Sequence, residues 1–151
     1  MWMTWAVVSG PPGEALARAP AKGVKVDRVD ARGCGEVVVA GQAVQGAAPG
    51  LCVVQALWAP LEGGVVALLV RAPHRFEEEE RLRVFIYRLE GRRLVPRFLG
   101  SGFASREVRR LVALDDALGV EVSGDGGVSV LRCSFDGFPL VCRDDPLLSP
   151  G

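Results

Sequence analysis

Two segments decide the fold class: Val65-Val66-Ala67-Leu68-Leu69-Val70 and Leu82-Arg83-Val84-Phe85-Ile86-Tyr87-Arg88-Leu89. Both are nearly continuous apolar runs, and their β-branched and aromatic residues favour strands. Gly and Pro interrupt such runs at intervals of about 8–12 residues, a spacing typical of all-β proteins. We therefore expect an all-β chain with little helix. Its antiparallel meanders would form propeller-like blades or a compact barrel or sandwich.

Further strands are expected on both sides of this pair, and the Gly-, Ala- and Pro-rich stretches between them are expected to be loops. The predicted strands are residues 24–29, 36–40, 51–58, 94–99, 120–122, 128–133 and 139–142.

The segment 105–114 fits two interpretations. A helix would place Val108 and Leu111 on one face, because residues three apart are neighbours on a helix. A strand would place alternate residues from Val108 to Leu114 on one face, Arg110 among them. The surrounding β pattern favours the strand.

The length of 151 residues and the mass of 16.1 kDa suit one domain. Residues 1–23 are rich in Gly, Pro and Ala and are predicted to be an N-terminal extension. Residues 24–142 form the predicted single β domain, and residues 143–151 the predicted tail.

A degenerate internal repeat is suggested by the segments 36–58, 65–89 and 120–135, each of which is a strand, a loop and a longer strand. In the second and third segments a Gly-containing turn, Glu90-Gly91 or Asp136-Gly137, leads to one more strand. Such a unit buries its apolar face by stacking on its neighbours. The alternative is that Val-rich hairpins look alike by chance.

The stretch Phe85-Ile86-Tyr87-Arg88-Leu89-Glu90-Gly91-Arg92-Arg93-Leu94-Val95-Pro96-Arg97-Phe98-Leu99-Gly100-Ser101 resembles the repeats of bacterial FG-GAP/VCBS-type β-propeller proteins. Ser134-Phe135-Asp136-Gly137-Phe138 is similar to the strand end that closes such a unit. The resemblance implies propeller blades. Family members often carry calcium loops, but the matching segment 114–119 lacks the alternating carboxylates that calcium needs.

A closed propeller needs at least about four blades of four strands, and this chain supplies two or three. The resemblance therefore implies that the chain closes differently, oligomerises or docks its open sheet edges on a partner.

Charge and hydropathy exclude several functions. The chain has 18 basic and 18 acidic residues, so a net charge of zero gives it no general attraction to nucleic acid or anionic membranes. Its longest apolar stretches are too short to span a bilayer, so no transmembrane segment is expected. The sixteen Arg against two Lys, and the absence of Asn, suit a GC-rich or thermophilic bacterium.

The four cysteines are Cys34, Cys52, Cys133 and Cys142, and none forms a C-x-x-C motif. A tight turn at Gly137-Phe138 would place Cys133 opposite Cys142, where either a disulfide or two buried thiols would fit. An oxidised pair would favour an extracytoplasmic or thermophilic setting, and a reduced pair the cytoplasm. The compartment is therefore left open.

Few side chains suit catalysis, and no catalytic, cofactor-binding or metal-binding residue is predicted. The one histidine, His74, lies beside an acidic loop, where it would form a weak ligand site with Glu77, Glu78, Arg71 and Arg83. The alternative is a solvated loop whose charges pair with one another.

These observations favour a non-catalytic interaction or scaffold domain that binds a protein partner or forms a homo-oligomer within an assembly. The alternatives are a small ligand-binding or hydrolytic barrel that uses His74, and a fragment of a longer propeller protein.

Overall fold

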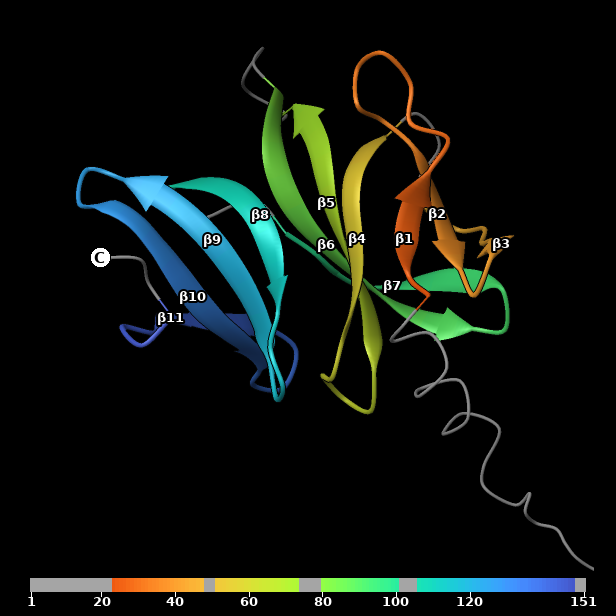
Figure 1. Cartoon of the computed structure of the whole chain (residues 1–151). Coiled ribbons are helices and arrows are strands. Elements are labelled where there is room, and N and C mark those ends of the chain that lie inside the picture. Colours follow the sequence, from red (N-terminus) through yellow and green to blue (C-terminus); the bar gives the residue numbers. More distant parts are fainter. Residues whose placement is uncertain (1–22, 48–50, 74–79, 101–105, 149–151) are drawn as a thin grey trace, which may run out of the picture.

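The computed structural model describes residues 23–47, 51–73, 80–100 and 106–148. Within these ranges the chain is all-β and has no helix, as predicted (Figure 1). The strands are β1 (Lys25–Asp27), β2 (Glu36–Val39), β3 (Gln42–Ala43), β4 (Cys52–Ala59), β5 (Val65–Pro73), β6 (Glu80–Glu90), β7 (Arg93–Leu99), β8 (Glu107–Ala113), β9 (Leu118–Gly124), β10 (Gly127–Phe135) and β11 (Leu140–Asp144).

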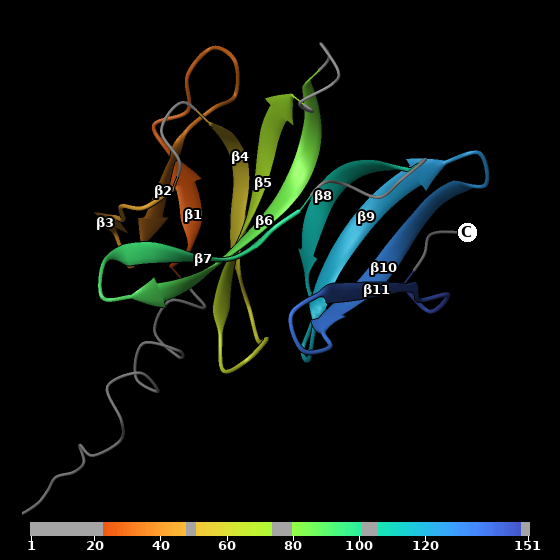
Figure 2. The same cartoon turned by 180° about the vertical axis from the view of Figure 1, so that it is seen from behind.

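The strands form three antiparallel sheets that follow one another along the chain (Figure 2). The first sheet has the order β1-β2-β3, and the others are four-stranded meanders, β4-β5-β6-β7 and β8-β9-β10-β11. In the described part of the chain no sheet closes on itself. The barrel alternative is therefore wrong, and the antiparallel meanders are confirmed.

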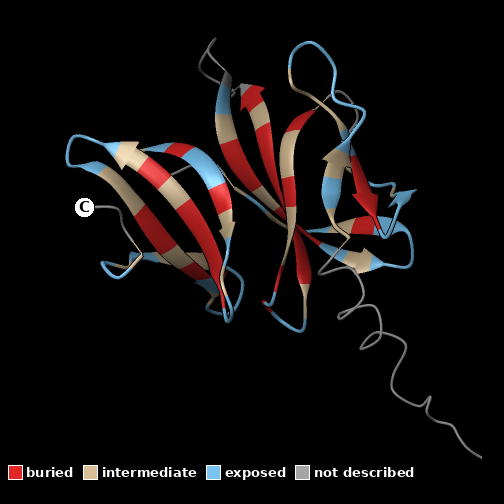
Figure 3. Ribbon diagram, in the orientation of Figure 1, coloured by how far each residue is buried: buried red, intermediate tan, exposed pale blue. Residues whose placement is uncertain are grey.

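The middle sheet is covered on both faces (Figure 3). Along β5 the odd-numbered residues Val65, Ala67 and Leu69 pack against β8, β9 and β10. The even-numbered residues Val66, Leu68 and Val70 pack in a second core that includes Val37 of β2. All six β5 side chains are 2% exposed or less. Burial on both faces explains why this strand is a continuous apolar run in the sequence.

Of the first strands of the three sheets, β4 is a neighbour of both β1 and β8. Three β-bulges interrupt the registers of the two larger sheets, and the extra residues are Val54 in β4, Arg97 in β7 and Arg109 in β8. A bulge bends its strand and changes the direction of nearby side chains.

Within the segment 105–114 the strand interpretation is confirmed for Glu107–Ala113, but the predicted face is wrong. Val108 and Leu111 both lie in the core, whereas Arg110 is exposed. The bulge at Arg109 causes this, because one extra residue between Val108 and Arg110 shifts the alternation. The core residues Val108 and Leu111 are therefore three positions apart, which is the spacing expected on one face of a helix.

Most strand ends differ by one to three residues from the predicted ranges, and two differences change the organisation of the chain. β3 lies in a stretch predicted to be a loop, and it is only two residues long. β11 extends through Asp144, two residues into the predicted tail. The predicted extension lies outside the described residues except for Gly23. Of the segments compared with one another, 65–89 contains β5 and all but the last residue of β6, and 120–135 contains most of β9 and all of β10.

Candidate interaction surface

The hairpin of β10 and β11 carries the predicted cysteine pair. Cys133 and Cys142 are directly opposite in the register, with Cα atoms 4.1 Å apart, and they form a disulfide. Cys133 is fully buried and belongs to the core between the two larger sheets. The disulfide therefore ties the edge strand β11 to the core of the molecule.

A second disulfide, Cys34–Cys52, was not predicted. Its Cα atoms are 4.7 Å apart, and it joins the loop between β1 and β2 to the start of β4. The Asp30 carboxylate accepts hydrogen bonds from the backbone N–H groups of Cys34 and Arg32, which lower its pKa. The two disulfides account for all four cysteines.

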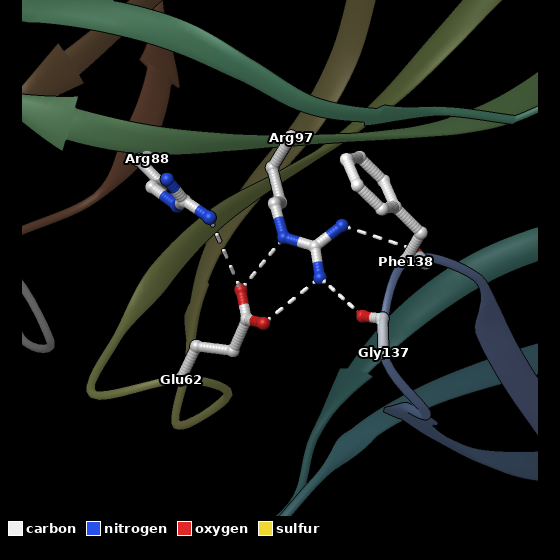
Figure 4. A network of polar contacts seen from close by, with 5 residues as sticks. All are labelled: Glu62, Arg88, Arg97, Gly137 and Phe138. Carbon is white, nitrogen blue, oxygen red and sulfur yellow. Dashed lines mark hydrogen bonds and ion pairs between the residues drawn. The ribbon is translucent and has the colours of Figure 1, made fainter.

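Arg97 joins three parts of the fold (Figure 4). Its Nε and Nη2 donate to the two carboxylate oxygens of Glu62, in the β4–β5 turn, at 2.7 and 2.8 Å. Its Nη2 also donates to the carbonyl oxygen of Gly137 at 2.7 Å, and its Nη1 to that of Phe138 at 2.9 Å. Only 7% of the Arg97 side chain is exposed. The guanidinium thus fixes the β10–β11 turn against the middle sheet.

The electrostatics of this contact favour the charged forms of both groups. The hydrogen bonds from Arg97 lower the pKa of Glu62, and those same bonds raise the pKa of Arg97. Arg88 adds a weaker attraction, since its Nη2 lies 3.9 Å from a Glu62 oxygen. The paired charges stabilise the seam between the sheets without any requirement for a ligand.

Aromatic rings surround the Arg97 guanidinium. Its central carbon lies 3.8 Å from the ring centroid of Phe135 and 5.5 Å from that of Phe138. Phe135 also makes an edge-to-face contact with Phe98, with centroids 6.4 Å apart. Phe138 is nevertheless 85% exposed. The turn thus presents a large apolar ring to solvent from a backbone that Arg97 holds in place.

The outer face of the C-terminal sheet, which does not face the middle sheet, is polar. Arg132 and Arg143 are opposite each other on β10 and β11, beside the opposed pair Ser134 and Val141. These four residues contribute to a shallow surface pocket. Asp116 and Asp145 both accept hydrogen bonds from Arg132. Ion pairs between a strand and the loops beside it suit a face in contact with water.

The predicted ligand site is only partly described. His74, Glu77 and Glu78 lie outside the described residues. In the register Arg71 is opposite Leu82 and Arg83 is opposite Val70, so the two arginines point to opposite faces of the sheet. Arg71 donates to the Arg32 carbonyl oxygen, and the buried Arg83 to that of Ala72. The structure does not bring the two guanidinium groups together.

Three arginines on β8 or directly before it have acidic neighbours. Arg109 and Arg110 both lie near the Glu121 carboxylate, at 3.5 and 3.1 Å. Arg106 binds Asp144, whose pKa it lowers. These ion pairs lie on β8 and around it, at the surface of the molecule.

Sequence reasoning missed the role of Arg97, although one signal was present. Pro96 precedes it, and a proline within a strand indicates an edge strand or a bulge because it lacks an N–H donor. β7 is an edge strand, and Arg97 is the extra residue of its bulge. Nothing in the sequence indicates that the side chain reaches a turn 40 residues away.

Comparison with models of known protein families, with characterised proteins and with solved structures finds no match for this chain. Among the residues with a described position, no helix is long and apolar enough to cross a membrane. No cluster of three or more His, Cys, Asp or Glu side chains in the same residues has the geometry to hold a metal ion. The interaction surface is therefore judged by its own geometry.

Proposed function

We propose that this chain is a non-catalytic interaction module that works as a subunit of a protein assembly, with the β10–β11 hairpin as its contact surface. The observation that carries the proposal is the 85% exposure of Phe138 on a turn whose carbonyls are held by Arg97. Exposed aromatic rings are common anchors of protein interfaces. A turn that is already ordered loses little conformational freedom on binding.

The two disulfides support an oxidising, extracytoplasmic setting for this assembly. Disulfides persist in such compartments and are rare in reducing ones, hyperthermophiles excepted. The partner would therefore be a protein of the cell surface or of another extracytoplasmic space.

We also propose that the three sheets are propeller-like blades. Support comes from their face-to-face stacking, from the adjacency of β4 to both β1 and β8, and from the sequence-order meanders β4–β7 and β8–β11. Because the outer face of the last sheet is ionic, we expect it to remain in water and to resemble the polar cap of a repeat array.

The test is native mass spectrometry and chemical cross-linking of the protein purified from its own host, as wild type and as Phe138→Ser. We expect a discrete complex that dissociates at lower energy or is lost in Phe138→Ser. Leu147→Ser is the matched control, because Leu147 is 94% exposed but lies outside the hairpin. A monomer in all three samples, or a complex equally insensitive to both substitutions, would contradict the proposal.

A further inference from the structure

Three of the six sheet edges in the described residues, those of β4, β7 and β8, are bonded by another part of the chain. The side chain of Gln55 bonds the backbone of Leu111 on β8. The N–H of Gly35 donates to the Val53 carbonyl on β4. The backbone of Gln45 makes two hydrogen bonds with the β6–β7 hairpin. Its N–H donates to the Arg92 carbonyl oxygen, and its own carbonyl oxygen accepts from the N–H of Leu94 on β7. Such covers matter because an open edge is a template for another strand.

The edge of β11 differs, and the register shows which of its groups point outward. Directly opposed residues about 4.5 Å apart at Cα form the non-hydrogen-bonded pairs of an antiparallel ladder. Cys133 and Cys142, at 4.1 Å, are such a pair. The Asp145 N–H bond to the Val130 carbonyl, three residues further along each strand, agrees with this alternation.

Cys142 therefore directs its N–H and C=O away from β10, and Leu140 and Asp144 do the same because the pattern repeats every two residues. Within the described part of the chain, no backbone hydrogen bond reaches these outward groups. The strand is also firmly held, by the disulfide at Cys142 and by Arg97 at the preceding turn. An added strand would meet an edge that is already ordered.

The side chains beside this edge specify the chemistry of the added strand. Val141 and Arg143 share the outer face, two residues apart. Arg143 is exposed and has no ion-pair partner among the described residues, whereas Asp144 is paired with Arg106. A strand beside β11 would therefore be favoured by a carboxylate opposite Arg143 and a β-branched side chain opposite Val141.

A second copy of this chain does not fit these requirements. Two-fold antiparallel pairing of two β11 edges, with outward groups facing each other, allows only registers that shift in steps of two residues. Registers centred on residues 141 to 143 place Pro139, Val141 or Arg143 opposite Arg143. The register centred on Asp144 places Asp145 there, but that carboxylate is already bonded to Arg132, and Leu147, which is not β-branched, would lie opposite Val141. Charge complementarity thus favours a different protein.

We propose that the free edge of β11 binds an extended segment of a partner protein by strand addition, with a carboxylate side chain and a β-branched apolar side chain two residues apart. This inference rests on the proposed interaction function and assigns the chemical class of its partner. Backbone bonds to Leu140, Cys142 and Asp144 provide attachment, and Arg143 provides selectivity.

The test uses two peptides that have an acetylated N-terminus, an amidated C-terminus and threonine at alternate positions. One carries valine and glutamate two residues apart, and the other has lysine in place of glutamate. We expect the glutamate peptide to bind about five- to ten-fold more tightly, and to slow amide exchange at Leu140, Cys142 and Asp144. Arg143→Glu should reverse the preference. Equal binding of the two peptides by both proteins, or no protection of these amides, would overturn the proposal.

A backbone variant tests the edge itself. Asp144→Pro removes one outward N–H, and we expect it to weaken binding by about ten-fold. Asp144→Ala loses the same carboxylate but keeps the N–H, so it should bind like wild type. The outcomes also separate the two proposals. If the partner from the host binds Arg143→Glu and Asp144→Pro unchanged, the edge proposal fails and the interaction function stands. If no complex is found in the host but the peptides behave as expected, the interaction function fails and the edge site stands.

Discussion

Gln55 pairs its side-chain amide with both backbone groups of Leu111. Its Nε2 donates to the Leu111 carbonyl oxygen and its Oε1 accepts from the Leu111 N–H, each at 2.8 Å. Leu111 lies in β8, the edge strand that borders β4. The extra residue Val54 immediately precedes Gln55. One amide therefore takes the place of a neighbouring strand and joins the two larger sheets.

We expect Gln55→Ala to lower the free energy of unfolding by about 2 kcal/mol, because two partly buried backbone groups of Leu111 lose their partners. Denaturant unfolding followed by circular dichroism measures this change. Gln45→Ala is the control, since Gln45 is exposed and covers β7 with its backbone alone. Equal stability of the two variants would show that the Gln55 bonds do not hold the seam.

The fold class followed from local sequence, but the details of register did not. Apolar runs and turn residues give strands wherever the alternation is regular, as in β5, β6 and β10. A bulge changes that alternation by one residue, as at Arg109, and no local signal in β8 marks it. Its position depends on packing against the middle sheet, where Val108 and Leu111 both meet the core.

The bulge gives a prediction about three neighbouring side chains. We expect Leu111→Ala to cost about 2–4 kcal/mol and Val108→Ala about 1–2 kcal/mol, because both residues are buried in the same core. Arg110→Ala should cost less than about 1 kcal/mol, since its exposed ion pair with Glu121 contributes little. Chemical denaturation of the three variants provides the comparison. A strand without a bulge would make Val108 and Arg110 behave alike.

The candidate surface was partly predictable for a similar reason. Cys133 and Cys142 are nine residues apart around one turn, so hairpin geometry alone places them together. Cys34 and Cys52 are 18 residues apart, and they lie in a loop of the first sheet and on a strand of the second, so their pairing depends on how those sheets stack. The Arg97 contacts with Gly137 and Phe138 likewise depend on the arrangement of whole sheets.

Replacing Arg97 tests whether it holds the β10–β11 turn. Arg97→Met keeps most of the apolar stem but loses the bonds to Glu62 and to both turn carbonyls. We expect a lower melting temperature and faster amide exchange at residues 136–138. Arg88→Met is the matched control, because its single contact with Glu62 is long and exposed. If amide exchange in the β10–β11 turn rose equally in both variants, the Arg97 side chain would not be what holds the turn in place.

Acid should weaken the same contact. Arg97 lowers the pKa of Glu62 from the ordinary value of 4.5, so the contact is at full strength above that pH. Its contribution to stability is lost as the pH falls through the lowered pKa. We expect melting temperatures to decline less steeply in Glu62→Gln than in wild type over this acidic range. Parallel curves for the two proteins would indicate that the Glu62 charge does not contribute.

Removal of the disulfides should affect the two ends of the molecule differently. The double substitution of Cys34 and Cys52 by alanine opens the longer loop, and we expect it to cost about 3 kcal/mol. The same change at Cys133 and Cys142 opens a shorter loop. The unfolded chain then gains less conformational entropy, so the loss of unfolding free energy from this source is smaller. Its local effect is larger, because β11 is an edge strand with a single neighbour, β10.

The measurement combines thermal unfolding with amide exchange for both double variants. Only the Cys133 and Cys142 variant should show faster exchange along β11, and it should also lose the peptide binding proposed for that edge. The Cys34 and Cys52 variant is the control, since its disulfide is remote in sequence from the hairpin and it retains the Arg97 clamp. Unchanged exchange in β11 without its disulfide would mean that the ladder with β10 and the clamp at the turn suffice to hold the edge.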